Sequence, residues 1–186
     1  FDNTVTVWRY NSETSRFEKR PFLRIKEPDG LWAVGLSNNN QIIATGNKNG
    51  LVTLRNIKGQ LIKTIPAHNQ KIWSLDFSSD NKYFTTASAD KTVKIWDLSG
   101  KLLKTLSGHA DEILTVKISP DSKQIVSGSR DGKVKLWDVT GKPLHTFIDG
   151  SNAHSDEVLD VRWSADGKLI ASASDDDTVK IWNVKQ

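Results

Sequence analysis

The residue types with the greatest chemical potential recur together as a histidine, a serine or threonine, and an aspartate. Ser127, His109 and Asp131 contain the ingredients of a hydrolase triad, in which a base activates a hydroxyl nucleophile. The same set occurs in three successive segments, however, and catalysis needs one activated site rather than a periodic one. The motif G-x-S-x-G, which exposes a nucleophilic serine on a sharp turn, is absent from the sequence. We therefore expect these residues to be structural and the protein not to be an enzyme.

Metal and nucleotide chemistry have no support in the sequence. The histidines His68, His109 and His154 occupy the same slot in different repeats, so they cannot converge on one zinc ion. The acidic run at 175–177 lacks the alternating ligands and the glycine of a calcium-binding loop. The phosphate-binding motif G-x-x-x-x-G-K-[ST] is also absent. We expect neither a metal nor a cofactor.

The composition is typical of a soluble, globular chain. The 186 residues are 37% hydrophobic and 26% charged, and no apolar run approaches the length of a membrane span. The absence of cysteine excludes disulfides and thiolate metal sites and suits a reducing cytoplasm. The first ten residues lack the layout of a signal peptide, and because they begin within a repeat we expect a piece of a larger protein.

The net charge of +4 makes nucleic acid or another anionic ligand a partner to consider. Lys94, Lys135 and Lys180, however, recur with one period rather than forming a single cluster. Such lysines are typical of solvated strand positions, where they also discourage edge pairing. We therefore expect a protein partner and keep nucleic-acid binding as the alternative.

The chain repeats itself at intervals of about forty residues. Trp137 follows Trp96 by 41 residues, and Trp182 follows Trp137 by 45. The position 41 residues before Trp96 is Arg55, in a degenerate copy, and Trp8 marks a clipped copy at the start. Such a period is typical of repeat proteins, in which no single unit buries its hydrophobic face alone.

Each repeat contains the pattern of four short strands. In residues 68–106, four runs rich in β-branched and aromatic residues are separated by turn residues. Val93 and Ile95 alternate with Lys94 and Trp96, a period of two that indicates a strand. No segment shows the spacing of an amphipathic helix. The sequence therefore predicts an all-β fold of four-stranded antiparallel sheets.

The first strand of each repeat contains an irregular spacing of apolar residues. In the repeat at 68–106 these residues are Ile72, Leu75 and Phe77, so the first gap is three residues rather than two. An extra residue of this kind indicates a β-bulge, which re-aims side chains and is common near binding sites. The residues at the bulge are Trp32, Trp73, Leu114 and Leu159. Without a bulge, Trp73 would share a face with Leu75 and Phe77 and belong to the core, and the sequence leaves both interpretations open.

The repeats resemble the WD-repeat β-propeller family. The family pattern is Gly-His before the first strand, Ser or Thr in the second strand, Asp in the following turn and Trp-Asp at the end of the third strand. Three consecutive repeats carry this pattern in the sets His68, Thr86, Asp90 and Trp96; His109, Ser127, Asp131 and Trp137; and His154, Ser172, Asp176 and Trp182. Indole, hydroxyl, imidazole and carboxylate groups can form a chain of hydrogen bonds, so we expect these tetrads to be structural.

One repeat has lost this pattern. In the segment 27–65, the four slots hold Glu27, Thr45, Asn49 and Arg55. We expect this degenerate repeat to lack the hydrogen-bond network. Truncation of Arg55 is therefore expected to cost much less stability than truncation of Asp131.

The resemblance implies a β-propeller made of four-stranded antiparallel blades. The expected units are a clipped leading repeat at 1–26 with its third and fourth strands, the degenerate repeat at 27–65, full repeats at 68–106 and 109–148, and a repeat at 154–186 that lacks its fourth strand. These strands do not add up to a closed ring, so we expect a partial ring. We expect the rest of the propeller or another copy of the chain to complete it.

The resemblance also implies where a partner binds. In propellers of this family, the contacting residues lie in the bulge slot, two positions before it, and just ahead of the turn aspartate. These positions correspond here to Trp32, Trp73, Leu114 and Leu159; to Lys71, Glu112 and Glu157; and to Lys48, Ala89, Arg130 and Asp175. Their types differ from copy to copy while the tetrads repeat, as expected if one set serves recognition and the other architecture.

The predicted function is that of a non-enzymatic protein–protein scaffold or a target-sensing propeller in the cytoplasm. The regular sequence of the repeats resembles that of bacterial, especially cyanobacterial, propeller proteins. We therefore expect the chain to be part of a larger bacterial signalling or defence protein. The alternative is binding of nucleic acid or an anionic ligand through the basic surface.

Overall fold

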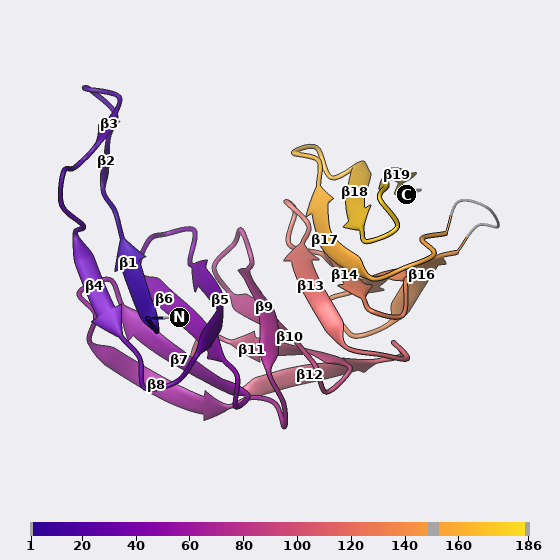
Figure 1. Cartoon of the computed structure of the whole chain (residues 1–186), viewed down its shortest axis with the longest axis horizontal. Coiled ribbons are helices and arrows are strands. Elements are labelled where there is room, and N and C mark those ends of the chain that lie inside the picture. The colour runs from indigo at the N-terminus through magenta and orange to yellow at the C-terminus, as the bar shows by residue number, and fades with distance from the viewer. Residues whose placement is uncertain (1, 149–152, 185–186) are drawn as a thin grey trace.

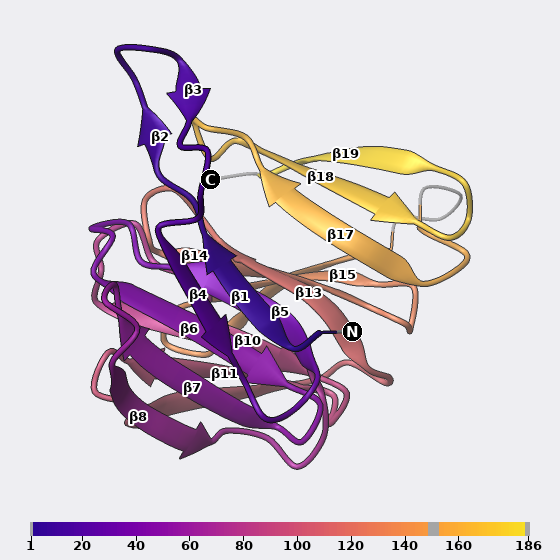
Figure 2. The same cartoon turned by 60° about the vertical axis from the view of Figure 1, so that its left-hand side comes forward.

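The chain folds into an open arc of β-sheets, as the computed structural model in Figures 1 and 2 shows. The structure describes residues 2–148 and 153–184, and every regular element in these ranges is a strand. The N-terminal strands lie at one end of the arc and the last sheet lies at the other, so the ring is not closed (Figure 1). The expected all-β fold and partial ring are confirmed.

Four sheets follow one another along the arc, and each is an antiparallel meander. The first sheet contains β5 (Leu31–Leu36), β6 (Ile42–Asn47), β7 (Leu51–Asn56) and β8 (Leu61–Pro66). The second contains β9 (Ile72–Phe77), β10 (Tyr83–Ser88), β11 (Thr92–Asp97) and β12 (Leu102–Ser107). The third contains β13 (Ile113–Ile118), β14 (Gln124–Ser129), β15 (Val134–Asp138) and β16 (Pro143–Phe147). The fourth has the described strands β17 (Val158–Trp163), β18 (Leu169–Ser174) and β19 (Val179–Asn183).

A smaller sheet, which we call the leader sheet, precedes the first sheet. In it β1 (Thr4–Val7) pairs antiparallel with β4 (Leu23–Lys26). Between these strands, a hairpin of β2 (Tyr10–Asn11) and β3 (Arg16–Phe17) projects from the arc (Figure 2). Val5 of β1 and Ile25 of β4 pack against Ile43 of β6, so the leader sheet covers part of the first sheet. The sequence did not predict the projecting hairpin.

The turns between the first and second strands share one backbone conformation. Their residues with positive φ are Asn40 (57°), Asn81 (55°), Ser122 (60°) and Gly167 (70°). Asn and Gly tolerate this left-handed conformation, which accounts for the Asp-Asn and Asp-Gly pairs in the sequence. In each of these turns, the hydroxyl oxygen of a serine before the turn accepts a hydrogen bond from the backbone N–H of a residue after the turn. Examples are Ile42 N–H to Ser37 Oγ and Gln124 N–H to Ser119 Oγ, both at 2.9 Å.

The hydrophobic cores lie between consecutive sheets. Leu75 and Phe77 of β9 pack in one cluster with Val52 and Leu54 of β7. The cluster between the second and third sheets repeats this arrangement with side chains from β11 and β13. Each inner sheet therefore presents one face to the sheet before it and the other face to the sheet after it, which brings the first strands β5, β9, β13 and β17 next to one another.

Candidate functional site

The tetrad residues are hydrogen-bonded in the second, third and fourth sheets. In the third sheet, Ser127 Oγ lies 2.8 Å from His109 Nε2 and accepts the indole N–H of Trp137 at 3.0 Å. His109 Nδ1 lies 3.0 Å from Asp131 Oδ2. The same three contacts in the second and fourth sheets measure between 2.7 and 2.9 Å. Each tetrad therefore ties the segment before the first strand to the second and third strands.

One arrangement of protons satisfies every polar group of a tetrad. In the second sheet the indole N–H of Trp96 donates to Thr86 Oγ1, and the Thr86 hydroxyl donates to His68 Nε2. His68 Nδ1–H then donates to Asp90. This arrangement requires a neutral imidazole, because protonated Nε2 would leave the buried hydroxyl hydrogen without that acceptor. Burial lowers the pKa of His68, even though the hydrogen bond and charge of Asp90 act to raise it.

The aspartate of each tetrad anchors backbone as well as histidine. Burial acts to raise the pKa of Asp131, but its hydrogen bonds outweigh burial and lower that pKa to about 2. The donors are His109 and the backbone N–H groups of Ala110 (2.8 Å) and Lys133 (3.0 Å). Asp131 thus joins the segment before β13 to the turn between β14 and β15.

The distances among Ser127, His109 and Asp131 are those of a hydrolase triad, yet the serine cannot meet a substrate as placed. Ser127 is completely buried, and its hydroxyl oxygen already accepts the indole N–H of Trp137. A nucleophile has to reach the reacting carbon of its substrate. The geometry therefore supports a structural role for this set.

In the first sheet, an ion pair occupies two of the four tetrad slots. Arg55 Nε donates to Glu27 Oε1 at 2.9 Å, and Arg55 Nη2 donates to Glu27 Oε2 at 3.4 Å. Arg55 Nη1 also donates to the carbonyl oxygen of Gly59 at 3.1 Å. The side chain of Glu27 is only 6% exposed. The expectation that this repeat lacks a network is therefore wrong, because Arg55 is the partner of a buried carboxylate.

A register shift occurs at each of the four bulge positions. The pairing strand skips Trp32, Trp73, Leu114 and Leu159. Trp32 is 41% exposed and Leu159 is 46% exposed, whereas Trp73 and Leu114 are half-buried. None of the four belongs to a hydrophobic core cluster of the described residues. The strand geometry is therefore that of the bulge interpretation, not that of the core interpretation.

The bulges lie along one edge of the arc, which we call the first-strand rim. It consists of the segments 27–32, 67–73, 108–114 and 153–159 and the turns 47–51, 88–92, 129–133 and 174–178. Backbone hydrogen bonds join each turn to its neighbouring segment: the N–H of Ala89 donates to the carbonyl of Lys71, and that of Arg130 donates to Glu112, both at 2.9 Å.

Trp32 and Trp73 meet on this rim in an edge-to-face pair. Their ring centres are 5.1 Å apart. Lys71 Nζ lies 4.2 Å from the ring centre of Trp32 and 3.9 Å from that of Trp73, which are cation–π distances. The indole N–H of Trp73 donates to Glu112 Oε2 at 2.8 Å. Residues from three sheets therefore form one cluster.

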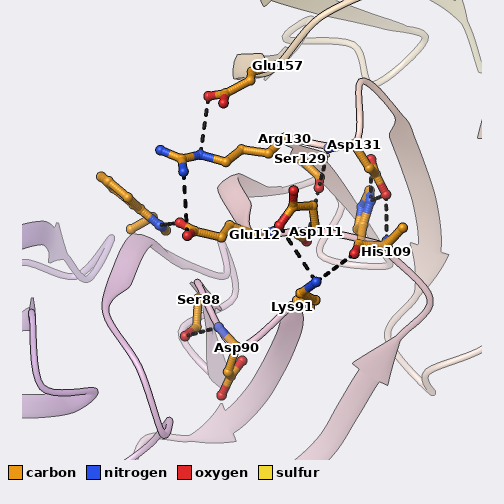
Figure 3. Close-up of polar contacts among 12 residues, drawn as sticks. Ser88, Asp90, Lys91, His109, Asp111, Glu112, Ser129, Arg130, Asp131 and Glu157 are labelled. Atoms are coloured by element: carbon orange, nitrogen blue, oxygen red, sulfur yellow. Dashed lines mark hydrogen bonds and ion pairs between the residues drawn. The ribbon is translucent and has the colours of Figure 1, made fainter.

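Arg130 extends this cluster to the fourth sheet (Figure 3). Its Nη1 lies 3.5 Å from Glu112 Oε1, and its Nε lies 3.3 Å from Glu157 Oε2. The guanidinium carbon is also 5.7 Å from the ring centre of Trp73. The sequence assigned Glu112 and Glu157 to one contact slot and Arg130 to another, and the structure brings all three side chains together in one network.

A shallow depression of about 470 Å³ lies within the first-strand rim. Its lining residues are Lys48, Asn69, Gln70, Lys71, Trp73, Ala89, Glu112 and Arg130. Asn69 and Gln70 were not predicted, although their position directly before Lys71 was a signal that could have identified them. Ala89 is buried although it lines the depression. The predicted residues that do not line it are Trp32, Leu114, Glu157, Leu159 and Asp175.

Neither a metal-binding cluster nor a membrane-spanning helix is found in the described part of the chain. No group of three or more His, Cys, Asp or Glu side chains in residues 2–148 and 153–184 is placed to hold a metal ion. Over the same residues, no helix has the length and apolarity needed to cross a membrane.

Comparisons with known proteins agree with this architecture. The family model "WD domain, G-beta repeat" matches residues 59–97, 100–138 and 141–183, each match running from the fourth strand of one sheet to the third strand of the next. Among solved structures, the chain is similar to the crystal structure of the computationally designed Ika4 protein. That likeness has a TM-score of 0.74 and 26% sequence identity, over 86% of this chain and 94% of that one. No curated protein matches the sequence. Because the family model matches more than half of the chain, the protein belongs to the WD40-repeat family, and its sheets are blades of an open β-propeller.

Proposed function

We propose that this chain is a non-enzymatic module that binds a protein partner on its first-strand rim. WD40 propellers typically bind protein partners. The observation that carries the proposal is the pair of Trp32 and Trp73, which lies at two bulges outside the cores between sheets. Tryptophan is enriched among the residues that dominate interface energies. Because contacts with Lys71 and Glu112 already hold the indole of Trp73, that side chain has little freedom left to lose on binding.

The wider setting of this module is also a proposal. The regular repeats favour a scaffold or target-sensing part of a larger bacterial signalling or defence protein. The lack of cysteine favours the cytoplasm.

Peptide binders selected on the purified protein can test the proposed rim. Peptides from a random displayed library are titrated calorimetrically against the wild type, Trp73→Ala and Trp8→Ala. Trp8 is the matched control, because its indole is 48% exposed and lies outside the first-strand rim. We expect Trp73→Ala to weaken the selected peptides by at least about fivefold, or about 1 kcal/mol, and Trp8→Ala to leave them unchanged. Peptides that tolerate Trp73→Ala and map to another face would contradict the proposal.

Binding of nucleic acid or another anionic ligand is the second candidate, and the net charge of +4 favours it. All three periodic lysines, however, donate hydrogen bonds within the chain, and Lys135 Nζ donates to Thr146 Oγ1 at 3.2 Å. Lys94 Nζ donates to the carbonyl oxygen of Ala67 at 2.6 Å, and Lys180 Nζ donates to that of Ala153 at 2.7 Å. These lysines brace the segments before the first strands. An affinity that falls steeply with salt would favour the anionic ligand, and a salt-tolerant affinity that depends on Trp73 would favour the protein partner.

We also infer that another blade covers the open face of the fourth sheet. Val179 on this face is 70% exposed, whereas Val93, its equivalent in the second sheet, is completely buried by the following sheet. The first sheet, near the opposite end of the arc, also exposes a residue whose equivalent in the second sheet is buried. Val34 of β5 is 61% exposed, whereas its equivalent Leu75 is 4% exposed. In the described chain, the face of the fourth sheet that holds Val179 is therefore open, and the leader sheet leaves the β5 part of the first sheet uncovered.

Further blades suit these faces better than a second copy of the chain does. The described fourth sheet has three strands and the leader sheet has two, which makes five strands where a blade holds four. The association state of the protein, measured by light scattering after size-exclusion chromatography, tests whether molecules associate through these faces. We expect association that Val179→Lys reduces and that Leu103→Lys, a control on exposed β12, leaves unchanged. A monodisperse monomer with the scattering profile of a closed ring would contradict this inference.

A further inference from the structure

The charges on the first-strand rim are separated along the arc. Outside the Glu27–Arg55 pair and the tetrads, the rim of the first two sheets carries Lys48, Lys71 and Lys91 against Asp29. The rim of the third and fourth sheets carries Asp111, Glu112, Asp156, Glu157, Asp175 and Asp177 against Arg130 and Lys133. One half of the rim is therefore basic and aromatic, and the other half is acidic.

Lys48 and Lys71 are available to an incoming anion. Within residues 2–148 and 153–184, neither ammonium group forms an ion pair with a carboxylate. Both side chains line the depression. The stem of Lys48 and the indole nitrogen of Trp32 both lie beside Gly30, so this lysine borders the exposed indole.

The single carboxylate that lines the depression does not neutralise these lysines. Glu112 accepts the indole N–H of Trp73 and pairs with Arg130, a contact that Figure 3 shows. A partner carboxylate in the depression would therefore meet two ammonium groups. Charge-assisted contacts of this kind are shorter and stronger than neutral hydrogen bonds.

The acidic half of the rim carries carboxylates that lack a cation partner among the described residues. The side chains of Asp156, Asp175 and Asp177 are exposed, and none forms an ion pair with a cation in the described part of the chain. The nearest guanidinium on this part of the rim, that of Arg130, is already shared between Glu112 and Glu157. Carboxylates of this kind repel one another and attract a partner cation.

We propose that the first-strand rim binds an extended polypeptide segment whose charges are segregated. A carboxylate at one end lies over Lys48 and Lys71, with a neighbouring apolar side chain against Trp32. A lysine or arginine at the other end lies over Asp156 and Asp175. This inference rests on the proposed function and adds the chemistry and the polarity of the partner.

The dimensions of the fold limit the length of this segment. Packed sheets lie about 10 Å apart, so the path from the first two sheets to the fourth spans roughly 20–30 Å. An extended chain advances about 3.3 Å per residue. A segment of roughly six to nine residues therefore connects the two ends.

Two synthetic peptides of equal composition test the charge order. One is EELSGSGSKK, with its charges segregated, and the other is EKSLGSEKSG, with its charges mixed. Binding is followed through the indole N–H resonances of Trp32 and Trp73 in a nuclear magnetic resonance titration. We expect the segregated peptide to bind at least about fivefold more tightly, because it alone satisfies both ends of the rim. Equal affinities, or no shift with either peptide at about 5 mM, would overturn the proposal.

Charge reversal of the protein locates the two ends. We expect Lys48→Glu with Lys71→Glu to weaken the segregated peptide by at least about fivefold, and Asp156→Lys with Asp175→Lys to do the same. The matched control for the lysine pair is Lys58→Glu with Lys101→Glu, which makes the same charge change in turns between third and fourth strands, outside the rim. A control as damaging as the Lys48→Glu/Lys71→Glu variant would show an effect of net charge alone and overturn the proposal.

The failure of this inference is distinguishable from failure of the proposed function. Library-selected peptides that depend on Trp73 but tolerate both charge reversals would overturn the charge order and leave the rim as the binding surface. Selected peptides that are indifferent to Trp73 would overturn the rim itself.

Discussion

The first and third sheets solve the same structural problem with different chemistry. In the third sheet, His109 before the first strand is linked to Trp137 of the third strand through the hydroxyl of Ser127. In the first sheet, Glu27 and Arg55 occupy the end slots of that chain and contact each other directly. Both arrangements tie the segment before the first strand to the third strand. The requirement of the fold is this connection, and more than one set of residues meets it.

The two sheets also differ in how they close the turn after the second strand. In the third sheet Asp131 Oδ1 accepts the N–H of Lys133 at 3.0 Å. In the first sheet Asn47 Oδ1 accepts the N–H groups of Asn49 and Leu51, both at 2.9 Å. The amide of Asn47, two positions before the slot that Asp131 fills in the third sheet, thus replaces the carboxylate, and the turn does not depend on the ion pair.

The largest effect is expected from breaking the ion pair of the first sheet. Arg55→Ala leaves the carboxylate of Glu27 buried without its partner, which costs roughly 3 kcal/mol in the free energy of unfolding. Chemical denaturation measures this loss. Lys58→Ala, a truncation of an exposed cation in the same sheet, is the control and should change stability by less than about 0.5 kcal/mol. A loss at Arg55 as small as that at Lys58 would show that the pair does not stabilise the sheet.

Breaking the tetrad of the third sheet is expected to cost about 1–3 kcal/mol. Asp131→Ala removes the acceptor of His109 and of two backbone N–H groups, and buried donors left unpaired are costly. The control is Asp175→Ala, because this carboxylate lies on the same rim and forms no ion pair in the described part of the chain. Equal losses for the two variants in denaturant would refute the tetrad as a stabilising element.

A substituted first sheet can show whether the two solutions are interchangeable. Glu27→His, Asn49→Asp and Arg55→Trp together place a full tetrad around Thr45. We expect this triple variant to unfold within about 1 kcal/mol of the wild type, because the new groups can satisfy one another. Arg55→Trp alone should be less stable than the triple variant, since it leaves Glu27 unpaired. If adding the other two changes brings no recovery, the slots of the first sheet are not equivalent to those of the third.

The smallest expected effect is the change with pH in the stability that Asp131 contributes to the third sheet. The pKa of Asp131 is lowered to about 2 in the folded protein, below its ordinary value of 3.8. Its contribution is therefore complete above about pH 5 and declines as the pH falls toward 2, where the folded state also takes up the proton. We expect the stability difference between the wild type and Asp131→Asn to shrink over this range in denaturation experiments. A difference that stays constant from pH 6 to about pH 2 would contradict the role of the ionised carboxylate.

The sequence predicted those parts of the site that depend on local spacing. Ile72, Leu75 and Phe77 are spaced in a way that a regular strand does not allow, and this spacing located the bulges. The tetrads were predictable because their types recur in register. The pairing of Glu27 with Arg55 was not, since two charged residues 28 positions apart have no distinguishing pattern.

Other features needed the three-dimensional arrangement of the sheets. Glu112 and Glu157 hold the same slot in neighbouring repeats and Arg130 holds a different slot, but only the spacing between neighbouring sheets decides that their side chains meet. The same holds for the ammonium of Lys71 over two indoles. The hairpin of β2 and β3 escaped prediction because residues 11–20 are polar apart from Phe17 and carry no alternation of apolar and polar side chains.

The location of the cores between sheets makes the architecture modular at the level of the gene. A deletion of residues 100–140 would remove one fourth strand together with the first three strands of the next sheet. The strand β16 would then follow β11, and Val158 and Val161 of β17 would face Val93 and Ile95 in place of Ile113 and Val116. Since one set of β-branched side chains replaces another, the arc would shorten by one unit without exposing a core. Duplication of the same stretch would lengthen the arc in the same way, so such a protein can change its number of repeats without inventing a new interface.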